Sequence, residues 1–257
     1  MPYELLNAYL NLPLLLLVVS RLAGMIMFQP LLGSLSIPPQ VRMLLVLGLA
    51  AMVMPLVALP EQAPAAPLEL TLALGVELML GALLGLAVRA CFLALELAGQ
   101  IIAQESGLAF AEIVDPTSGG QQDVLSMVYV QLGAVVFMIV GGHRAVLAAC
   151  LDSFATIPLL SGPDLVERGA WLVLDALRAG GEVALRVAAP VLLTLFLVNV
   201  VLGFIGRVLP QLNVTVLGFS LKGLVVFVVA AVALPASMEA FVGGLELVMD
   251  LARSLLN

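Results

Sequence analysis

The chain has 257 residues, of which 63% are hydrophobic and 11% are charged, whereas soluble domains average about 45–50% apolar and about 25% charged residues. A soluble domain of this length would leave large apolar patches exposed to water. The net charge is −7, and the ten Lys and Arg residues are scattered along the chain, so no basic patch for nucleic acid is present. The composition predicts a membrane-type protein that contacts lipid and does not bind nucleic acid.

The first half of the sequence contains three apolar runs that are long enough to cross a bilayer, which takes about 20 helical residues. Prolines and glycines end the first two runs. The third run is too long for a single crossing, so we expect it to be bent, broken or projecting. The predicted helices cover residues 8–28, 41–59 and 68–103.

The second half predicts further helices, two of which are amphipathic. Gly180 and Gly181 are expected to interrupt the pattern. No stretch has the alternation of a strand, so the predicted fold is all-α, with long, bent helical hairpins. These helices cover residues 124–142, 143–157, 164–179, 188–209, 214–234 and 238–256, the last with an apolar stripe of Met238, Phe241, Val242, Leu245, Val248, Met249, Ala252 and Leu255.

Charged residues occur inside several apolar runs, where each costs about 2.5–3.5 kcal/mol at the centre of a membrane helix. We interpret them as charges buried against other protein chains, so that hydropathy overstates how many helices cross lipid. An alternative is a multi-pass solute transporter with Glu77, Arg89 and Glu96 as its coupling or substrate site. The predicted charges at subunit contacts are Glu77, Arg89, Glu96, Arg207 and Lys222, and Arg21 lies in an apolar run as well.

Residues 104–123 form the longest polar interruption of the sequence. Loops beyond about 12–15 residues are uncommon unless they are functional or disordered. The segment is either a solvent loop or a re-entrant, pore-facing segment, because irregular backbone at membrane depth must be enclosed by protein or line water.

No pattern typical of a catalytic or metal site is present. The single histidine, His143, has no partner cluster for a metal, and Cys91 and Cys150 fit neither a disulfide framework nor a redox motif. Phosphate-binding loops and nucleophile elbows are missing. The sequence therefore predicts no enzyme, no catalytic residues, no cofactor and no metal, and an intramembrane enzyme is the weakest alternative.

Short motifs spread over essentially the whole chain resemble the FliR family of flagellar and virulence export-gate proteins. Departures from the family pattern are Gly141, where Asn or Asp is common, and Ser220, where Pro is common. The motifs are Arg21-Leu-Ala-Gly24, Pro30, Gly33 to Pro38, Val41-Arg42, Gly107 to Phe110, Val114 to Pro116, Gly142-His143, Ser153, Ile157-Pro158, Asn199 to Gly203, Arg207, Pro210-Gln-Leu, Gly218-Phe219 and Lys222.

The resemblance implies a core subunit of the type III export gate, which forms a protein-conducting channel for unfolded flagellar substrates in a helical assembly with FliP and FliQ. Residues 1–180 would be FliP-like and residues 181–257 a FliQ-like hairpin. The implied location is the bacterial inner membrane at the flagellar basal body, with an FlhB-type switch protein as a further partner. A virulence export gate is the alternative.

The resemblance also implies that residues 106–122 plug the closed pore, and we call them the plug segment. Apolar side chains would seal the pore, and the glycines would let the segment move. The plug residues expected from the family are Ser106, Gly107, Leu108, Phe110, Ile113, Asp115, Pro116, Gly119 and Gly120.

Overall fold

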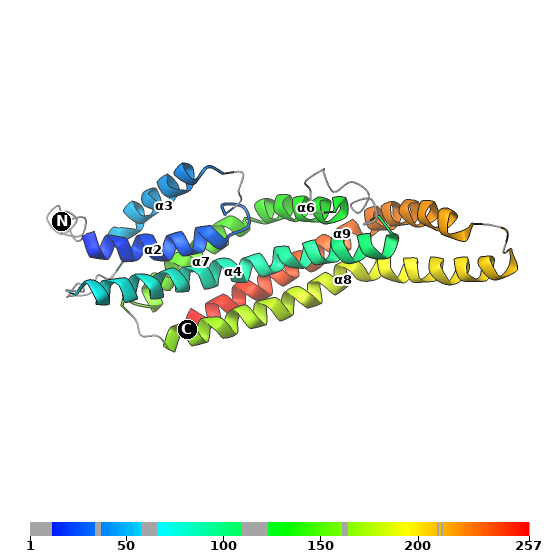
Figure 1. The fold of residues 1–257 in the computed structure, drawn as a ribbon. Helices are drawn as coiled ribbons and strands as arrows, with labels where there is room; N and C mark the ends of the chain where they lie inside the picture. The colour runs from blue at the N-terminus through cyan, green and yellow to red at the C-terminus, as the bar shows by residue number, and fades with distance from the viewer. Residues whose placement is uncertain are drawn as a thin grey trace. The chain divides into compact units, whose positions relative to one another are not determined.

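A computed structural model describes residues 12–33, 37–57, 66–108, 123–160, 164–209, 211 and 213–256. Within these ranges the regular structure is helical and contains no strand, which confirms the predicted all-α fold (Figure 1). The elements are α2 (Leu12–Phe28), α3 (Pro39–Val53), the 3-10 turn η1 (Met54–Leu56), α4 (Pro67–Ser106), α6 (Val124–Val140), α7 (Gly142–Thr156), α8 (Asp164–Val208) and α9 (Val214–Leu256).

The chain forms two compact units that interleave along the sequence. Unit 1 comprises residues 1–90, 141–178 and 245–257, and unit 2 comprises residues 91–140 and 179–244. Three helices, α4, α8 and α9, contribute residues to both units. The predicted division at residue 180 concerns likeness to FliP and FliQ and stays a prediction.

In unit 1, helices α2 and α4 approach each other closely along a seam of glycines. A Cβ atom added to Gly81 would lie 1.8 Å from the Arg21 carbonyl oxygen, and one added to Gly24 would lie 2.2 Å from the Leu78 carbonyl oxygen. Gly85 is equally restricted, because its Cβ would lie 2.6 Å from the Met25 carbonyl oxygen. The Gly81–Gly85 pair is the GxxxG spacing that permits such backbone contact.

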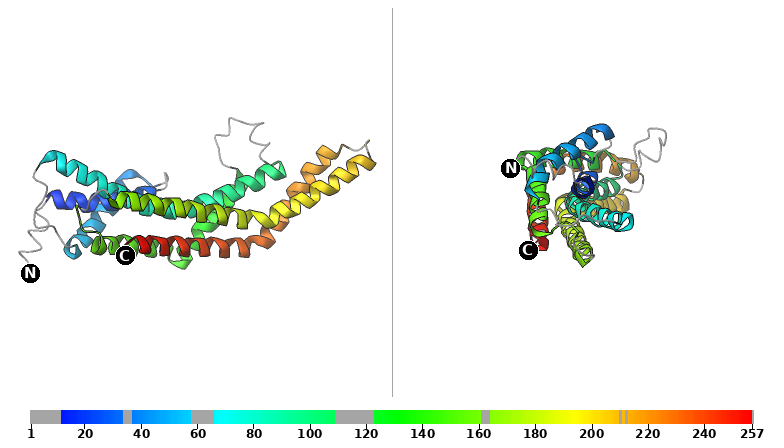
Figure 2. Two further views of the ribbon diagram at one scale, coloured as in Figure 1. Left: turned by 90° about the horizontal axis from the view of Figure 1, so that it is seen from below. Right: turned by 90° about the vertical axis from the view of Figure 1, so that its left-hand side faces the viewer.

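In unit 2, the core contains three aromatic rings from α4, α6 and α9. The ring centroid of Phe92 lies 5.5 Å from that of Phe137 and 5.3 Å from that of Phe241, both in edge-to-face geometry. Such pairs stabilise a core by about 0.5–1.5 kcal/mol beyond their area burial. In this unit α8 and α9 also run side by side and antiparallel on either side of residues 209–213 (Figures 1 and 2).

Two predicted helix boundaries are wrong. Helix α8 continues through Gly180, Gly181 and Pro190, and α9 continues through Pro235, so that residues 214–234 and 238–256 form one helix. Sequence-based rules expect glycine and proline to end a helix. In apolar surroundings, however, the neighbouring backbone N–H and C=O groups find hydrogen-bond partners most easily within a continuous helix. Helix α4 likewise runs unbroken for 40 residues, whereas a break was one of the predicted alternatives.

The predicted amphipathic stripe at the C-terminus is confirmed for the side chains that the structure describes, with Met238 and Val242 half-buried; the side chain of Leu255 lies outside them. The stripe residues Phe241, Leu245, Val248, Met249 and Ala252 are buried. The acidic and basic residues of the opposite side, Glu239, Glu246, Asp250 and Arg253, are exposed.

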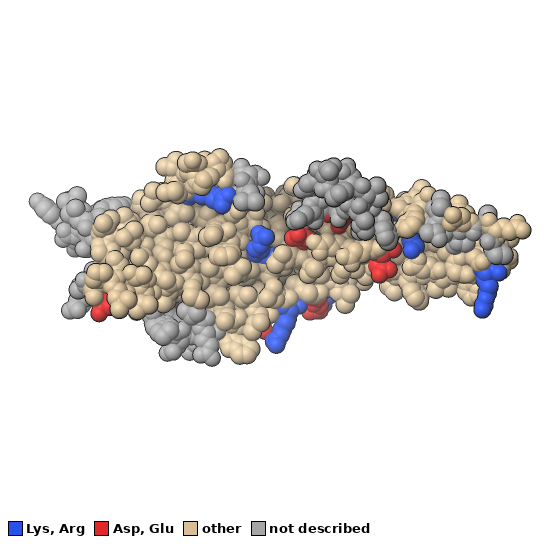
Figure 3. All heavy atoms as spheres, in the orientation of Figure 1, with Lys and Arg blue, Asp and Glu red and all other residues tan. Residues whose placement is uncertain are grey.

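Three described helices are long and apolar enough to cross a membrane: Pro67–Ser106, Gly169–Val208 and Leu217–Arg253. A fourth span is possible if Val124–Val140 and Gly142–Thr156 act together as one broken span. Charged side chains are sparse on the face that Figure 3 shows. The composition and the helices together make this a membrane-embedded protein.

Candidate functional site

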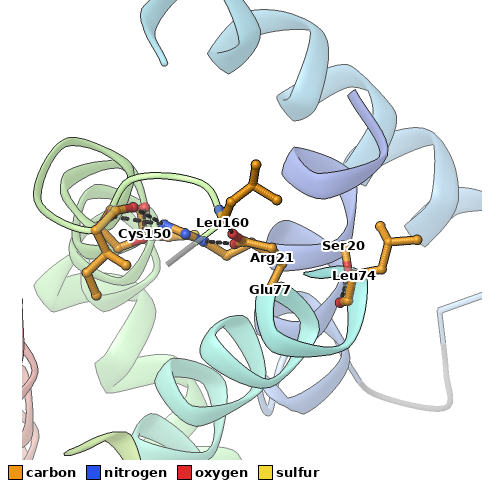
Figure 4. Close-up of polar contacts among 8 residues, drawn as sticks. Ser20, Arg21, Leu74, Glu77, Cys150 and Leu160 are labelled. Atoms are coloured by element: carbon orange, nitrogen blue, oxygen red, sulfur yellow. Dashed lines mark hydrogen bonds and ion pairs between the residues drawn. The ribbon is translucent and has the colours of Figure 1, made fainter. Parts of the chain in front are cut away.

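A buried ion pair in unit 1 joins α2 to α4. Nε of Arg21 donates to Oε2 of Glu77 at 2.6 Å, and the two side chains are 0% and 1% exposed. One residue earlier, the Ser20 hydroxyl donates to the Leu74 carbonyl oxygen at 2.7 Å (Figure 4). The pair forms where the glycine seam brings the backbones of α2 and α4 into close contact. The side chains of Arg21 and Glu77 can therefore meet directly between the two helices.

The same arginine also caps the C-terminal end of α7. Its Nη1 lies 3.0 Å from the Ser153 carbonyl oxygen and 3.2 Å from that of Ile157. The Ser153 carbonyl oxygen lies in the last turn of α7 and also accepts the Ile157 N–H at 2.9 Å, and Ile157 is the residue that follows the helix. A cation is favourable at this end of a helix because of the helix dipole. The guanidinium carbon lies 4.4 Å from the centroid of the Phe154 ring, within the range of a cation–π contact.

Glu77 accepts a second, weaker contact from the turn that follows α7. The Leu160 backbone N–H points to Oε1 of Glu77 at 3.4 Å. Leu160 has a φ of 69°, a left-handed conformation that is rare for a branched residue and costs about 1–3 kcal/mol. Arg21 and Glu77 therefore fix α2, α4, α7 and this turn together, and we call this set of contacts the Arg21–Glu77 network.

The energetic role of the network follows from its burial. Removing one member of a buried ion pair leaves an uncompensated charge and typically costs about 3–5 kcal/mol, whereas replacing both by apolar residues is often neutral. Within the described part of the chain, Nη2 of Arg21 has no hydrogen-bond partner. We interpret the network as specifying one arrangement of unit 1 more than it adds net stability.

The pairing of Arg21 with Glu77 was not predicted from the sequence. Glu77 was grouped instead with Arg89 and Glu96, and Arg89 lies 12 positions further along α4 and so about 18 Å away along the helix axis. Arg89 is exposed, and Glu77 is enclosed with Arg21 instead of lying open to a path for a solute. A signal was available, since Arg21 and Glu77 are opposite charges in the first and third apolar runs, and each charge is unfavourable in an apolar run without a partner.

The other predicted contact charges lie at or near the surface of the chain. Arg207 is exposed, and Glu96 and Lys222 are half-buried. Glu77 already has a partner inside the chain. The prediction that these residues and Arg89 meet neighbouring subunits stays a prediction.

The start of the plug segment lies among the described residues of unit 2. Helix α4 ends at Ser106, whose hydroxyl donates to the Ala103 carbonyl oxygen at 2.9 Å. Gly107 follows with a φ of 82°, and its N–H donates to the Gln104 carbonyl oxygen at 3.2 Å. A left-handed glycine at this place is a usual helix end. The remaining predicted plug residues lie outside the described ranges: Phe110, Ile113, Asp115, Pro116, Gly119 and Gly120.

Asp123 is the first described residue after the plug segment and is the N-cap of α6. Its carboxylate accepts the Leu125 N–H at 2.9 Å and the Ser126 N–H at 3.3 Å, a usual way to satisfy the first turn. The Ser126 hydroxyl also lies 3.1 Å from the Glu96 carbonyl oxygen, and a Cβ on Gly99 would lie 2.4 Å from the Ser126 Cα. The first turn of α6, which follows the plug segment in the sequence, is thus held against α4.

Among the described residues, no three His, Cys, Asp or Glu side chains are grouped as a metal site would require. An apolar groove of about 320 Å³ lies between α2 and α3 in unit 1. Its lining residues are Val19, Ala23, Ile26, Met27, Arg42, Met43, Val46 and Leu47. A groove with this lining lacks the several convergent polar groups that fix a cofactor or a substrate.

Comparison with known proteins decides the family. Residues 12–248 match the model of the family described as bacterial export proteins, family 1. The chain belongs to this family. It is 31% identical to the flagellar biosynthetic protein FliR of Escherichia coli K12 over 207 residues, 78% of this chain and 76% of the relative.

Two further relatives show how widely the family is used. The flagellar biosynthetic protein FliR of Bacillus subtilis strain 168 is 28% identical over 257 residues, 98% of each chain. The Yop proteins translocation protein T of Yersinia pestis is 28% identical over 207 residues, 80% of this chain and 79% of the relative. The chain is a subunit of a type III export gate, and its relatives favour the flagellar over the virulence system.

Proposed function

We propose that this family member forms, together with FliP and FliQ homologues, the channel through which unfolded flagellar proteins leave the cell. Its site of action is the bacterial inner membrane at the flagellar basal body, with an FlhB-type switch protein as a further contact. The observation that carries the proposal is the apolar surface of α8 and α9. Of the most apolar 18 residues of each helix, only 22% and 11% are buried within the chain.

That surface supports an assembly because the exposed side chains are large and contiguous. Unburied apolar area of this extent marks an interface with protein or lipid. In α8 the exposed side chains include Leu193, Phe196, Leu197, Val201 and Phe204, and in α9 they include Leu217, Leu224, Phe227, Val228 and Val232.

The direct test is co-purification of the tagged chain with its companions. We expect a defined complex that contains FliP and FliQ homologues, and a chain that aggregates when it is produced alone. Single alanine substitutions at Phe196 and Phe227 should lower recovery of the companions without changing production of the chain. Recovery of a stable, monodisperse chain without companions contradicts the proposal.

We further propose that the plug segment closes the resting channel through Leu108, Phe110 and Ile113, while Gly107, Gly119 and Gly120 allow it to move. The hydrogen bonds of Gly107 at the start of the segment and of Asp123 directly after it support fixed attachment points for the segment. Deleting residues 106–122 should make the assembled complex leak small ions. If permeability stays low and export stays normal after deletion, the plug proposal is wrong.

A virulence export gate is the second candidate, because the Yersinia translocation protein matches the chain over 207 residues, the same length as the flagellar relative from E. coli. Disruption of the gene separates the two. Loss of flagella and of swimming supports the flagellar assignment, and loss of effector secretion in a strain that still swims supports the virulence assignment.

A further inference from the structure

The apolar groove between α2 and α3 has the size and the lining of a site for a hydrocarbon chain. Seven of its eight described lining residues are Val, Ala, Ile, Met or Leu. Its α2 wall extends from Val19 to Met27, which is about 12 Å along the helix axis. A partner helix of that length and of about 10 Å diameter would occupy about 900 Å³, whereas the groove holds about 320 Å³. The groove therefore suits a slender, flexible occupant and not a second helix.

Arg42, the charged member of the described lining, lies at one end of the groove. Helix α3 runs back along α2 after a short connection (Figure 1), so Arg42, in the first turn of α3, is at the same end as Met27, in the last turn of α2. Nε and Nη2 of Arg42 donate to the Ile37 carbonyl oxygen at 3.2 Å and 2.9 Å. These bonds hold the guanidinium at this end, and a neutral carbonyl group does not cancel its positive charge.

The start of α3 adds to the positive potential around this guanidinium. The first turn of α3 contains no acidic residue, and its N-cap, Pro38, forms no side-chain capping bond. The start of a helix carries the positive end of the helix dipole, equivalent to about half an elementary charge. An anionic group beside Arg42 is thus favoured by the helix dipole as well as by the guanidinium, which binds phosphate oxygens through charge-assisted hydrogen bonds.

The membrane supplies a molecule that combines an apolar chain with an anionic phosphate. Helices α2 and α3 are apolar and have 17 and 15 residues, so each is shorter than the roughly 20 residues that cross the hydrocarbon layer. A charge at the end of such a short helix can lie at the level of the lipid head groups, where cationic side chains are usual. Basic pockets next to apolar helices are known to bind acidic lipid head groups.

We propose that this groove is a binding site for one anionic phospholipid, with an acyl chain between α2 and α3 and the phosphate on Arg42. The bound chain would cover the rim side chains Met27, Met43 and Leu47, which are 64%, 64% and 47% exposed. Both helices belong to unit 1. The inference concerns that unit alone and depends neither on the channel nor on the plug segment.

The first experiment tests the role of the charge, with the intact gate complex exchanged into detergent and lipid binding followed by native mass spectrometry. The probes are palmitoyl-oleoyl-phosphatidylglycerol, which is anionic, and phosphatidylcholine with the same acyl chains, which has no net charge. Arg42→Gln should weaken binding of one phosphatidylglycerol per copy of this chain by about 10-fold, the effect of one charge-assisted hydrogen bond. It should leave the binding of phosphatidylcholine unchanged.

Arg144→Gln is the matched control, because Arg144 is exposed on α7 of the same unit and does not line the groove. It should bind both lipids as wild type does. If Arg42→Gln also binds phosphatidylglycerol as tightly as wild type, or if wild type does not prefer the anionic lipid, the proposal is wrong.

A second pair of variants tests whether the acyl chain occupies the groove. Ala23 is a half-buried residue of the lining, so Ala23→Leu fills the groove and should abolish the binding of this phosphatidylglycerol. Ala148→Leu makes the same change at an exposed position of α7 outside the lining, and it should have no effect. Undiminished lipid binding by Ala23→Leu shows that the groove is not the site and overturns the proposal.

A third measurement needs no variant and decides the question even if Ala23→Leu does not fold. Phosphatidylglycerol with a diazirine in one acyl chain should label the wild-type complex within residues 19–27 and 42–47, and an excess of the unmodified lipid should reduce this labelling. Labelling of other segments only contradicts the proposal. If these residues stay unlabelled and Ala23→Leu lowers the recovery of companion subunits, a neighbouring subunit covers the groove in place of a lipid.

Discussion

Helix α4 and the helices α8 and α9 are similarly apolar and of similar length, yet they bury different amounts of surface. Of the most apolar 18 residues, 61% are buried in α4, against 22% in α8 and 11% in α9. Helix α4 carries the glycine seam and one member of a buried ion pair, and both are features that pack against the chain itself. Helices α8 and α9 instead present Leu, Val and Phe side chains outward.

The difference shows that hydropathy measures how unfavourable a segment is in water and says nothing about what covers it. Close helix contact needs small residues at matching positions, and such residues make α4 an interior helix. Large exposed side chains do the opposite, since they leave apolar area for lipid or for neighbouring subunits. The following predictions test this contrast, from the largest expected effect to the smallest.

Removing one member of the Arg21–Glu77 network should have the largest effect. Glu77→Ala leaves a buried guanidinium without its carboxylate, so we expect unit 1 to lose about 3–5 kcal/mol of stability. Arg21→Met with Glu77→Leu should recover most of that loss, because no buried charge remains. Thermal unfolding of the purified complex measures both. A double variant as unstable as the single variants contradicts the interpretation that the network mainly specifies the arrangement.

Filling the glycine seam should have the next largest effect. Gly81→Ala places a methyl group against backbone atoms of α2 that cannot move aside, and overpacking of this kind typically costs about 1–3 kcal/mol. Gly75→Ala is the control on the same helix. Nothing lies within 4 Å of its added Cβ, so this change should be neutral or should stabilise the helix by up to about 1 kcal/mol. If Gly81→Ala and Gly75→Ala change the stability equally, α2 does not pack closely on α4 at Gly81.

Truncating the exposed surface of α8 should affect assembly more than folding. Leu193 is 66% exposed, so Leu193→Ala should change the stability of the chain by no more than about 0.5 kcal/mol. Leu95→Ala, at a fully buried position of α4, should cost about 2–5 kcal/mol. Protease resistance of the complex and recovery of its partners distinguish the two. If Leu193→Ala and Leu95→Ala lose protease resistance to a similar extent, the proposed difference between α8 and α4 is wrong.

The smallest effect is expected at the exposed ion pairs. Nη1 of Arg253 lies 3.1 Å from Oδ1 of Asp250, with side chains 63% and 70% exposed. Exposed pairs of this kind contribute about 0–1 kcal/mol and are screened by salt. Arg253→Ala should therefore leave the melting temperature of the complex almost unchanged. A marked loss shows that the side chain has a partner outside the chain.

Much of the fold could be predicted because its causes are local in sequence. Apolar runs and helical periodicity identified the helices and the buried stripe of Phe241, Leu245 and Val248. Helix continuity through Gly181 and Pro235 could not be predicted, since the local preference of these residues is overruled by the need to satisfy the backbone in apolar surroundings. For the site, the charged residues in apolar runs could be predicted, and the pairing of Arg21 with Glu77 could not, because it depends on how α2 packs on α4.

The sequence by itself determined that this is an all-helical membrane protein of the export family, because composition and the order of short motifs need no knowledge of contacts. Only the tertiary structure decided which charges meet. Arg21 and Glu77 are 56 positions apart, and Arg89 and Glu96, seven apart on one helix, were the nearer pair by sequence. The physical reason is that a buried charge is stabilised by whichever opposite charge packing brings within hydrogen-bond distance, and the packing of α2 on α4 depends on glycines in both helices.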